Sequence, residues 1–220
     1  MNLDALLQDG WKRIQSLPDD PKDSVSIGKM TPNAQCFALV FPIDEGRAMP
    51  FNNNWEIING IHRSLAENQA LIEVNSGCDK DGVKYVYSII KTLQEQQVVQ
   101  YFARVNIKTA TDYFEANAFF DETGTTGFRD ATVYEYVKRQ YPEDEIQWMK
   151  DPYDDTFQQP YLMNISELEQ FDEMFPDHPL SQARRFIRLL VANQQTETEN
   201  TDHKSSNQRT DGYVGFVDGV

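Results

Sequence analysis

Residues 98–120 read VVQYFARVNIKTATDYFEANAFF, and this stretch decides the fold class. In residues 98–108 apolar side chains occupy every second position: Val99, Tyr101, Ala103, Val105 and Ile107. Residues 113–120 continue the pattern with Phe114, Ala116, Ala118 and Phe120. Because successive side chains of a strand point to opposite faces, this alternation predicts two strands of a sheet with one core face and one mostly solvated face.

Two further runs rich in Val, Ile and Tyr precede this stretch, at residues 71–74 and 83–92. The gaps between the four runs are short and polar. Short gaps allow antiparallel hairpins and exclude parallel crossovers, which need about a dozen residues or more. A fifth run, Cys36–Ile43, is apolar on both faces, which favours a central position. The sequence therefore predicts a mainly antiparallel sheet of about five strands.

Helical periodicity appears on both sides of the predicted sheet. It predicts amphipathic helices over residues 3–17, from about residue 54 to 65, over 131–140, and from Pro179 onward. Ser166 and Glu169 form a capping-box pattern that predicts another helix start. The fold class predicted is thus a single α+β domain, residues 1–192, with helices packed on the sheet. Residues 193–220 are predicted to form a flexible polar tail with a short apolar end.

The apolar end of that tail, Tyr213–Val220, allows two interpretations. It is either an untethered terminus or a peptide that docks on the edge of a sheet, in this protein or in a partner.

The net charge of −15 limits the partners that we expect. Nucleic-acid and anionic-membrane binders rely on basic surfaces, so neither partner is expected. If the protein has a charged protein partner, that partner is expected to be basic. The alternative is that the negative charge of this protein serves only its solubility. The two cysteines, Cys36 and Cys78, form no CxxC pair, and no signal-like or membrane-spanning stretch is present. These features predict a cytoplasmic protein with reduced thiols.

The best candidate for ligand binding is the loop Asp121–Asp130, between a predicted strand and a predicted helix. Backbone N–H groups at the start of a helix can hold an anion, and an arginine can assist. The candidate ligand-binding residues are Thr123, Gly124, Thr125, Thr126, Gly127 and Arg129. The loop lacks the GxxxxGK[ST] and GxGxxG patterns, and its acidic residues would repel a phosphate. The alternative is a strand-to-helix connection in which the glycines supply unusual φ and Thr126 or Asp130 caps the helix.

Other chemistry-bearing residues form no recognisable motif. Asp79 and Asp81 resemble the start of a calcium loop but lack its remaining ligands, so a hairpin turn is the simpler interpretation. The three histidines form no metal-binding pair, and no catalytic residue, metal or cofactor is predicted. Glu73 and Glu115 lie on predicted strands, where each either faces a pocket or occupies an ordinary outer-face position.

The layout of Cys36–Lys108 resembles the Mog1/PsbP-like group of small α+β proteins. The resemblance depends on a strand that ends in Phe41-Pro42, a following helix at Trp55–Leu65, and the long meander after it. It covers about a third of the chain. The resemblance implies a protein that acts mostly by binding, and it supplies no active-site residues.

The sequence favours a non-catalytic protein-binding module whose acidic surface engages a basic partner, in the manner of an immunity protein or a secretion-associated chaperone. The first alternative is a small enzyme or a small-ligand or anion-binding protein with its site at Asp121–Asp130. The second is a self-associating structural protein with an interface around Tyr85, Tyr87 and Phe102.

Overall fold

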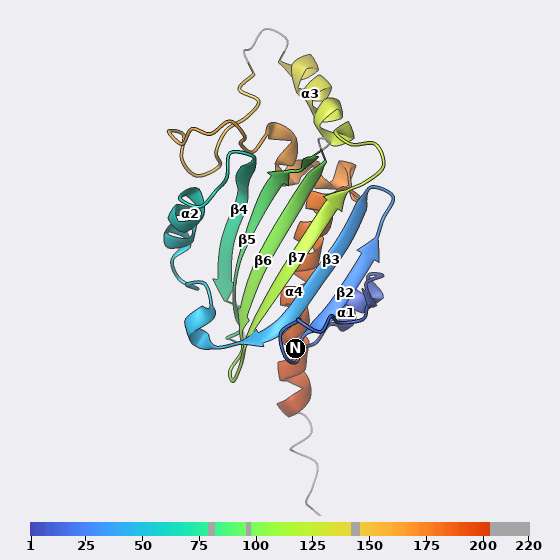
Figure 1. Ribbon diagram of the computed structural model, residues 1–220, viewed down its shortest axis with the longest axis vertical. Coiled ribbons are helices and arrows are strands. Elements are labelled where there is room, and N and C mark those ends of the chain that lie inside the picture. The colour runs from blue at the N-terminus through green and yellow to red at the C-terminus, as the bar shows by residue number, and fades with distance from the viewer. Residues whose placement is uncertain (79–81, 96–97, 142–145, 203–220) are drawn as a thin grey trace, which may run out of the picture.

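The computed structural model describes the chain except for residues 79–81, 96–97, 142–145 and 203–220. Within the described residues, seven strands form one sheet in the order β1-β2-β3-β7-β6-β5-β4, and every neighbouring pair is antiparallel. The strands are β1 (Lys12–Arg13), β2 (Val25–Met30), β3 (Ala34–Ile43), β4 (Gln69–Cys78), β5 (Lys84–Leu93), β6 (Val99–Lys108) and β7 (Tyr113–Glu122). Figure 1 shows this sheet as the centre of the molecule.

Helices lie on both faces of the sheet and beyond one end of it (Figure 1). The α-helices are α1 (Asp4–Gln8), α2 (Asn54–His62), α3 (Phe128–Gln140) and α4 (Pro179–Asp202). Short 3-10 helices are η1 (Glu45–Arg47), η3 (Ile165–Glu167) and η4 (Glu169–Met174). Within the described residues, no helix is both long and apolar enough to cross a lipid bilayer. The predicted α+β domain, with an antiparallel sheet packed by helices, is confirmed.

The predicted meander is present as β4 to β7, and β3 lies between β2 and β7, as its two apolar faces indicated. The sheet gains β1 and β2 beyond the five predicted strands. β4 also continues through Gly77, where the sequence predicts a turn, because Tyr85 of β5 packs its ring over that glycine. The possible calcium ligands Asp79 and Asp81 lie outside the described residues.

One face of the sheet carries the main core, and α4 and α1 cover it. The alternating side chains of β6 and β7 named above lie on this face, and nearly all of them are buried. Phe186 of α4 contacts Phe120 of β7 and Trp11, with ring centroids 5.9 Å and 5.1 Å apart. The face opposite α4 is only partly covered: α2 packs Ile57 and Ile58 there in a smaller cluster.

The strand register corrects the proposed self-association surface. Tyr87 pairs with Val105 on the face that α4 covers, whereas Phe102 pairs with Ile90 on the opposite face. Tyr85, two residues from Tyr87, also faces α4. The three aromatic residues therefore do not form one surface.

The helix predicted over residues 3–17 is wrong beyond α1. Gly10 has a φ of +93°, which ends the helix because this left-handed conformation favours glycine. The chain then turns into β1. Trp11 lies outside the helix but is still buried in the core. Its apolar side chain therefore marked a core position and not a further turn of helix.

The capping-box prediction near the C-terminus also needs correction. The capping box is formed by Asn164 and Glu167, two residues before the predicted pair, and it begins a 3-10 helix. The extended backbone of Leu168 (ψ 138°) separates η3 from η4 and prevents one long α-helix. Helix α4 begins at Pro179 as predicted and runs to Asp202. The domain boundary placed at residue 192 stays a prediction. The rest of the predicted tail, 203–220, lies outside the described residues.

Candidate functional site

The loop Asp121–Asp130 joins β7 to α3 and has the geometry of a connection. Gly124 and Gly127 have φ values of +72° and +70°, and Gly127 is the N-cap of α3. No side chain caps this helix, so the predicted caps are wrong. Glu122 accepts a hydrogen bond from the Gly127 N–H at 2.9 Å. The Glu122 carboxylate thus already accepts a hydrogen bond from the Gly127 N–H, which is one of the backbone donors that a bound anion would need.

The other candidate residues of the loop do not converge on one point. Thr125 and Thr126 are exposed, and the Thr123 N–H donates to the Asn33 carbonyl at 2.9 Å. Arg129 points away from them and is only 1% exposed. Its guanidinium donates to the Ser166 carbonyl at 2.7 Å. The contacts of Arg129 therefore give no support to an anion site here, and ligand binding at this loop stays a prediction.

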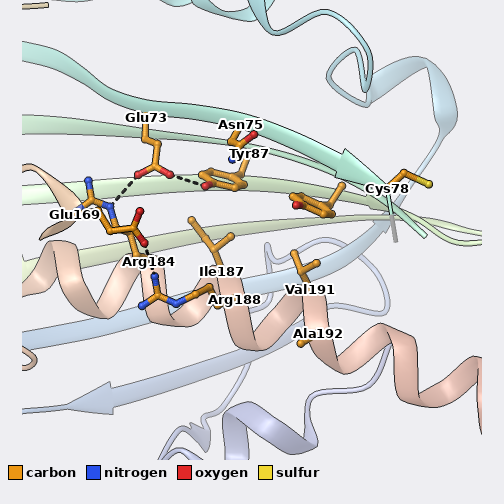
Figure 2. A pocket seen from close by; sticks show the side chains of 11 residues that line it. Glu73, Asn75, Cys78, Tyr87, Glu169, Arg184, Ile187, Arg188, Val191 and Ala192 are labelled. Atoms are coloured by element: carbon orange, nitrogen blue, oxygen red, sulfur yellow. Dashed lines mark hydrogen bonds and ion pairs between the residues drawn. The ribbon is translucent and has the colours of Figure 1, made fainter. Parts of the chain in front are cut away.

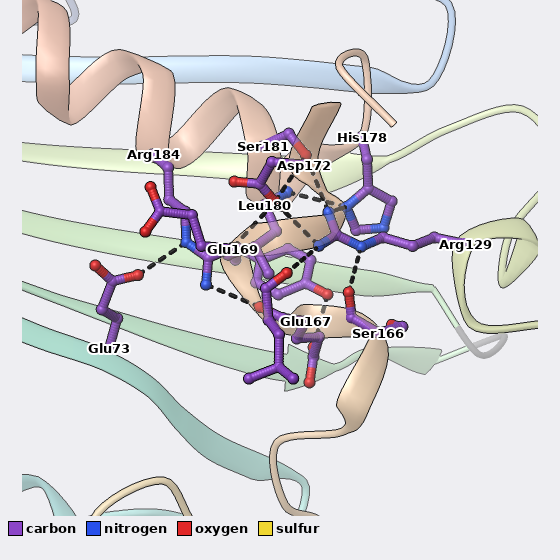
Figure 3. A network of polar contacts seen from close by, with 12 residues as sticks. Glu73, Arg129, Ser166, Glu167, Glu169, Asp172, His178, Leu180, Ser181 and Arg184 are labelled. Carbon is purple, nitrogen blue, oxygen red and sulfur yellow. Dashed lines mark hydrogen bonds and ion pairs between the residues drawn. The ribbon is translucent and has the colours of Figure 1, made fainter. Parts of the chain in front are cut away.

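Arg129 instead belongs to a buried polar network that Figure 3 shows from close by. Asp172 of η4 is its centre, because Asp172 Oδ1 accepts from Arg129 Nη2 and from Arg184 Nη1, each at 3.0 Å. The Ser181 hydroxyl donates to the same oxygen at 3.2 Å. Asp172 Oδ2 is buried and has no hydrogen-bond partner among the described residues. The network joins α3, η4 and α4 through a single carboxylate.

Arg184 extends this network to the sheet. Its Nε donates to Glu73 of β4 at 2.8 Å, and its Nη2 donates to the Glu167 carbonyl at 2.8 Å. Burial disfavours the charged guanidinium, but Asp172 and Glu73 outweigh burial and raise the pKa of Arg184. The arginine therefore stays charged and holds α4 to the edge strand β4.

A second buried ion pair lies beside the first network. Lys91 of β5 donates to Glu167 Oε2 at 2.8 Å, and both side chains are at most 2% exposed. The Tyr101 hydroxyl donates to the other oxygen of Glu167 at 2.8 Å. Burial, followed by the charge of Glu167, raises the pKa of Tyr101. Breaking such a pair leaves one charge buried without its partner, which costs about 3–5 kcal/mol of stability.

His178 borders the network and is held neutral. Its Nδ1 accepts a hydrogen bond from the Leu180 N–H at 3.2 Å. Burial lowers the pKa of His178 well below its usual range, and the positive charges of Arg129 and Arg184 lower it further. This histidine therefore contributes packing and a hydrogen-bond acceptor at neutral pH.

A cleft of about 510 Å³ opens where this network reaches the surface, between α4 and the strands β4 and β5. Figure 2 shows Glu73, Tyr87, Arg184 and Ile187 facing one another across it. The Tyr87 hydroxyl donates to Glu73 Oε1 at 2.5 Å, so both oxygens of Glu73 are engaged. Burial and the Glu73 charge raise the pKa of Tyr87. The cleft sets two arginines against two glutamates and is balanced in charge.

The remaining candidate residues have structural surroundings. Cys36 is buried, which raises the pKa of its thiol to about 12 and makes it a poor nucleophile. Asp151 accepts from the Tyr153 and Asp154 N–H groups, and its other oxygen lies 3.0 Å from His62 Nε2. The described residues contain no cluster of three or more His, Cys, Asp or Glu side chains that could hold a metal ion.

A surface at the α3 end of the molecule is the most unusual feature of the exposed side chains. Of the eleven large exposed apolar side chains in the described residues, seven come from residues 128–174. We call these seven the aromatic end: Phe128, Tyr134, Tyr136, Tyr141, Met149, Leu168 and Met174, each at least 39% exposed. Helix α3 buries only Arg129 and Val133 and extends beyond the sheet (Figure 1).

Two rings of the aromatic end pack on aromatic side chains of residues 171–175. Tyr136 packs edge-on against Phe171 with ring centroids 6.3 Å apart, and Phe128 packs against Phe175 in the same way at 6.1 Å. A concavity of about 430 Å³ lies beside Tyr136 and Tyr141. The buried network beneath, through Arg129, fixes α3 to η4. Phe128 and Tyr136 are therefore partly exposed rings that also pack against the domain.

Part of the buried network and of the cleft beside α4 was predicted from the sequence. Of the two strand glutamates singled out, Glu73 lines the cleft, and Glu115 is buried on the opposite face, bonded to Arg104. Asp172, Glu167 and Lys91 were missed. Charged side chains are rarely buried unless paired, so a sequence pattern places them at the surface. The sequence shows that residues 128–141 contain apolar side chains, but it does not show that these side chains are exposed to solvent.

No family model and no curated protein sequence matches the chain. Solved structures similar to it include two that each have 11% sequence identity and a TM-score of 0.34. The solution structure of cyanobacterial PsbP (CyanoP) from Synechocystis sp. PCC 6803 covers 59% of this chain and 78% of its own. The crystal structure of PA94, a protein of unknown function from Pseudomonas aeruginosa, covers 62% of this chain and 96% of its own. The predicted resemblance to the PsbP-like group is confirmed as a structural match, at a low TM-score, and no functional argument depends on it.

Proposed function

We propose that this protein is a non-catalytic protein-binding module and that its aromatic end is the surface that contacts the partner. The observation that supports the proposal is the concentration of exposed apolar side chains at this one end. Tyr, Phe and Met are enriched where proteins meet, so exposed side chains of these types support a role in protein contact.

The partner expected is a basic protein. The chain carries a net charge of −15, so a basic surface would be attracted over a range of about a Debye length and would associate faster. Apolar contacts at the aromatic end and the attraction between opposite charges would together supply the affinity. Such a complex weakens as salt rises from tens to hundreds of millimolar, because surface charges are screened.

The test is affinity purification from native lysate at low and high salt with three forms of the protein. These are the wild type, the double variant Tyr136→Ser/Tyr141→Ser, and the control Trp55→Ser. Trp55 is 56% exposed on α2, so its replacement removes an exposed aromatic side chain away from the aromatic end.

We expect a basic protein that co-purifies with the wild type and with Trp55→Ser, is lost with the double variant, and is released at high salt. The proposal fails if no protein is retained. It also fails if the double variant retains the same protein as the wild type.

A further inference from the structure

The face of the sheet opposite α4 contains a groove that the proposed protein contact does not use. It lies between α2, residues 47–50 and the strands β5 and β6, and its volume is about 480 Å³. Arg47, Arg63 and Arg104 line it, and the half-buried Ile90 and Phe102 belong to its apolar lining. We call it the arginine groove.

The charge of this groove is opposite to that of the protein as a whole. Three arginines line it with one carboxylate, Glu56, which accepts a hydrogen bond from Asn53 at 3.1 Å. The cleft beside α4, in contrast, is balanced. In a chain of net charge −15, most arginines would be expected to find carboxylate partners.

Arg104 has such a partner. Its Nε and Nη2 donate to Glu115 Oε2 at 3.0 and 2.6 Å, and its Nη2 also reaches the Arg47 carbonyl at 3.3 Å. Burial opposes the charge of Glu115, but Arg104 and Asn106 outweigh it and lower the pKa of Glu115. Glu115 is therefore a charged anchor that fixes Arg104 at the groove.

Arg47 and Arg63 have no such partner. Both are exposed, and within the described residues neither guanidinium makes a hydrogen bond or an ion pair. A guanidinium has five donors in a planar fork that matches a carboxylate, so these two side chains are unused donors beside an apolar surface.

Gly60 keeps the α2 side of the groove open. A Cβ at this position would meet no other atom within 4 Å, and Gly60 lines the groove. A glycine inside a helix costs about 1 kcal/mol relative to alanine. The position therefore allows a larger side chain to fill the groove without disturbing the backbone, which provides a sharp test.

From this combination we propose that the arginine groove binds a small amphiphilic carboxylate. The carboxylate would pair with Arg47 and Arg63, and an apolar body would lie against Ile90 and Phe102. The groove volume is within the range of about 300–1,000 Å³ that is usual for small-molecule sites.

The test is calorimetric titration of the intact protein with three probes at low salt. Octanoate has both the charge and the apolar body, acetate has only the charge, and 1-octanol has only the apolar body. We expect octanoate to bind at least tenfold more tightly than either of the other two. No octanoate binding at millimolar concentration, or equal binding of octanoate and 1-octanol, would overturn the proposal.

Three variants locate the binding. Arg63→Gln, an exposed change at the C-cap of α2, should weaken octanoate binding about tenfold, and Gly60→Leu should abolish it. Gly60→Ala is the matched control and should bind like the wild type. Octanoate binding that survives Gly60→Leu would place the ligand elsewhere and refute the assignment. This outcome is independent of the protein-binding proposal, whose loss-of-binding variants change Tyr136 and Tyr141, neither of which lines the groove.

Discussion

Replacement of Arg129 by methionine tests whether this arginine is a structural brace or a ligand-binding residue. Arg129→Met keeps most of the side-chain volume but removes the donors to Ser166, Ser181 and Asp172, all of which are buried. Asp172 would then keep Arg184 as its only charged partner. Removal of one member of a buried ion pair costs about 3–5 kcal/mol, because the remaining charge is desolvated without full compensation.

The assay is equilibrium unfolding in urea, followed by tryptophan fluorescence. With a slope of about 2 kcal/mol per molar urea, the expected loss lowers the midpoint by about 1.5–2.5 M. The matched control is Arg188→Met. Arg188 pairs with Glu169 at 3.0 Å, but the two side chains are 58% and 66% exposed. Exposed pairs contribute about 0–1 kcal/mol, so this control should shift the midpoint by less than about 0.5 M.

Equal midpoints for the two variants would refute the structural role of Arg129. A rise in melting temperature with inorganic phosphate that disappears in Arg129→Met would instead support the anion site predicted at Asp121–Asp130.

Three further results are expected. The pKa of His178 is lowered in the folded state and is about 6.5 in the unfolded state, so the unfolded state takes up the proton first as pH falls. The free energy of unfolding should therefore fall by up to about 1.4 kcal/mol per pH unit below pH 6.5. In His178→Gln, urea midpoints measured between pH 6.5 and 5 should depend less on pH. Native protein should react with one equivalent of a thiol reagent, at exposed Cys78, while Cys36 reacts only after unfolding; two fast equivalents would contradict its burial. Gly77→Ala should destabilise by about 1–3 kcal/mol, because a Cβ there overlaps the Tyr85 ring, and calorimetry should show partial recovery on adding Tyr85→Leu.

The sheet could be predicted from the sequence because its signal is local. In β6 and β7 every second side chain is apolar, and the register of the two strands places these side chains on one face. The hairpin links are short enough to fix the antiparallel order without any long-range information.

The N-terminal segment shows where local pattern is insufficient. Leu3, Leu6 and Trp11 have helical spacing and are all buried, yet Gly10 redirects the chain between them. The cost of a glycine inside a helix is about 1 kcal/mol, which the burial of Trp11 against Phe186 easily outweighs. Gly10 therefore ends α1, and the packing of Trp11 against Phe186 fixes the direction in which the chain continues.

The candidate site depends almost entirely on distant pairs. Lys91 and Glu167 are 76 positions apart, and Glu73 and Arg184 are 111 apart. A lysine on a strand gives no local sign that it is buried, since burial is tolerated only because the partner is present. In the same way, the exposure of the α3 aromatics depends on what the rest of the chain leaves uncovered.

The central claim is that the aromatic end contacts a protein partner, and amide hydrogen exchange with and without the co-purified partner tests it most directly. The account predicts slower exchange in the complex for α3 and for residues 163–175, with β1, β2 and α2 unchanged. Protection confined to those three elements, or to the cleft beside α4, would contradict the account.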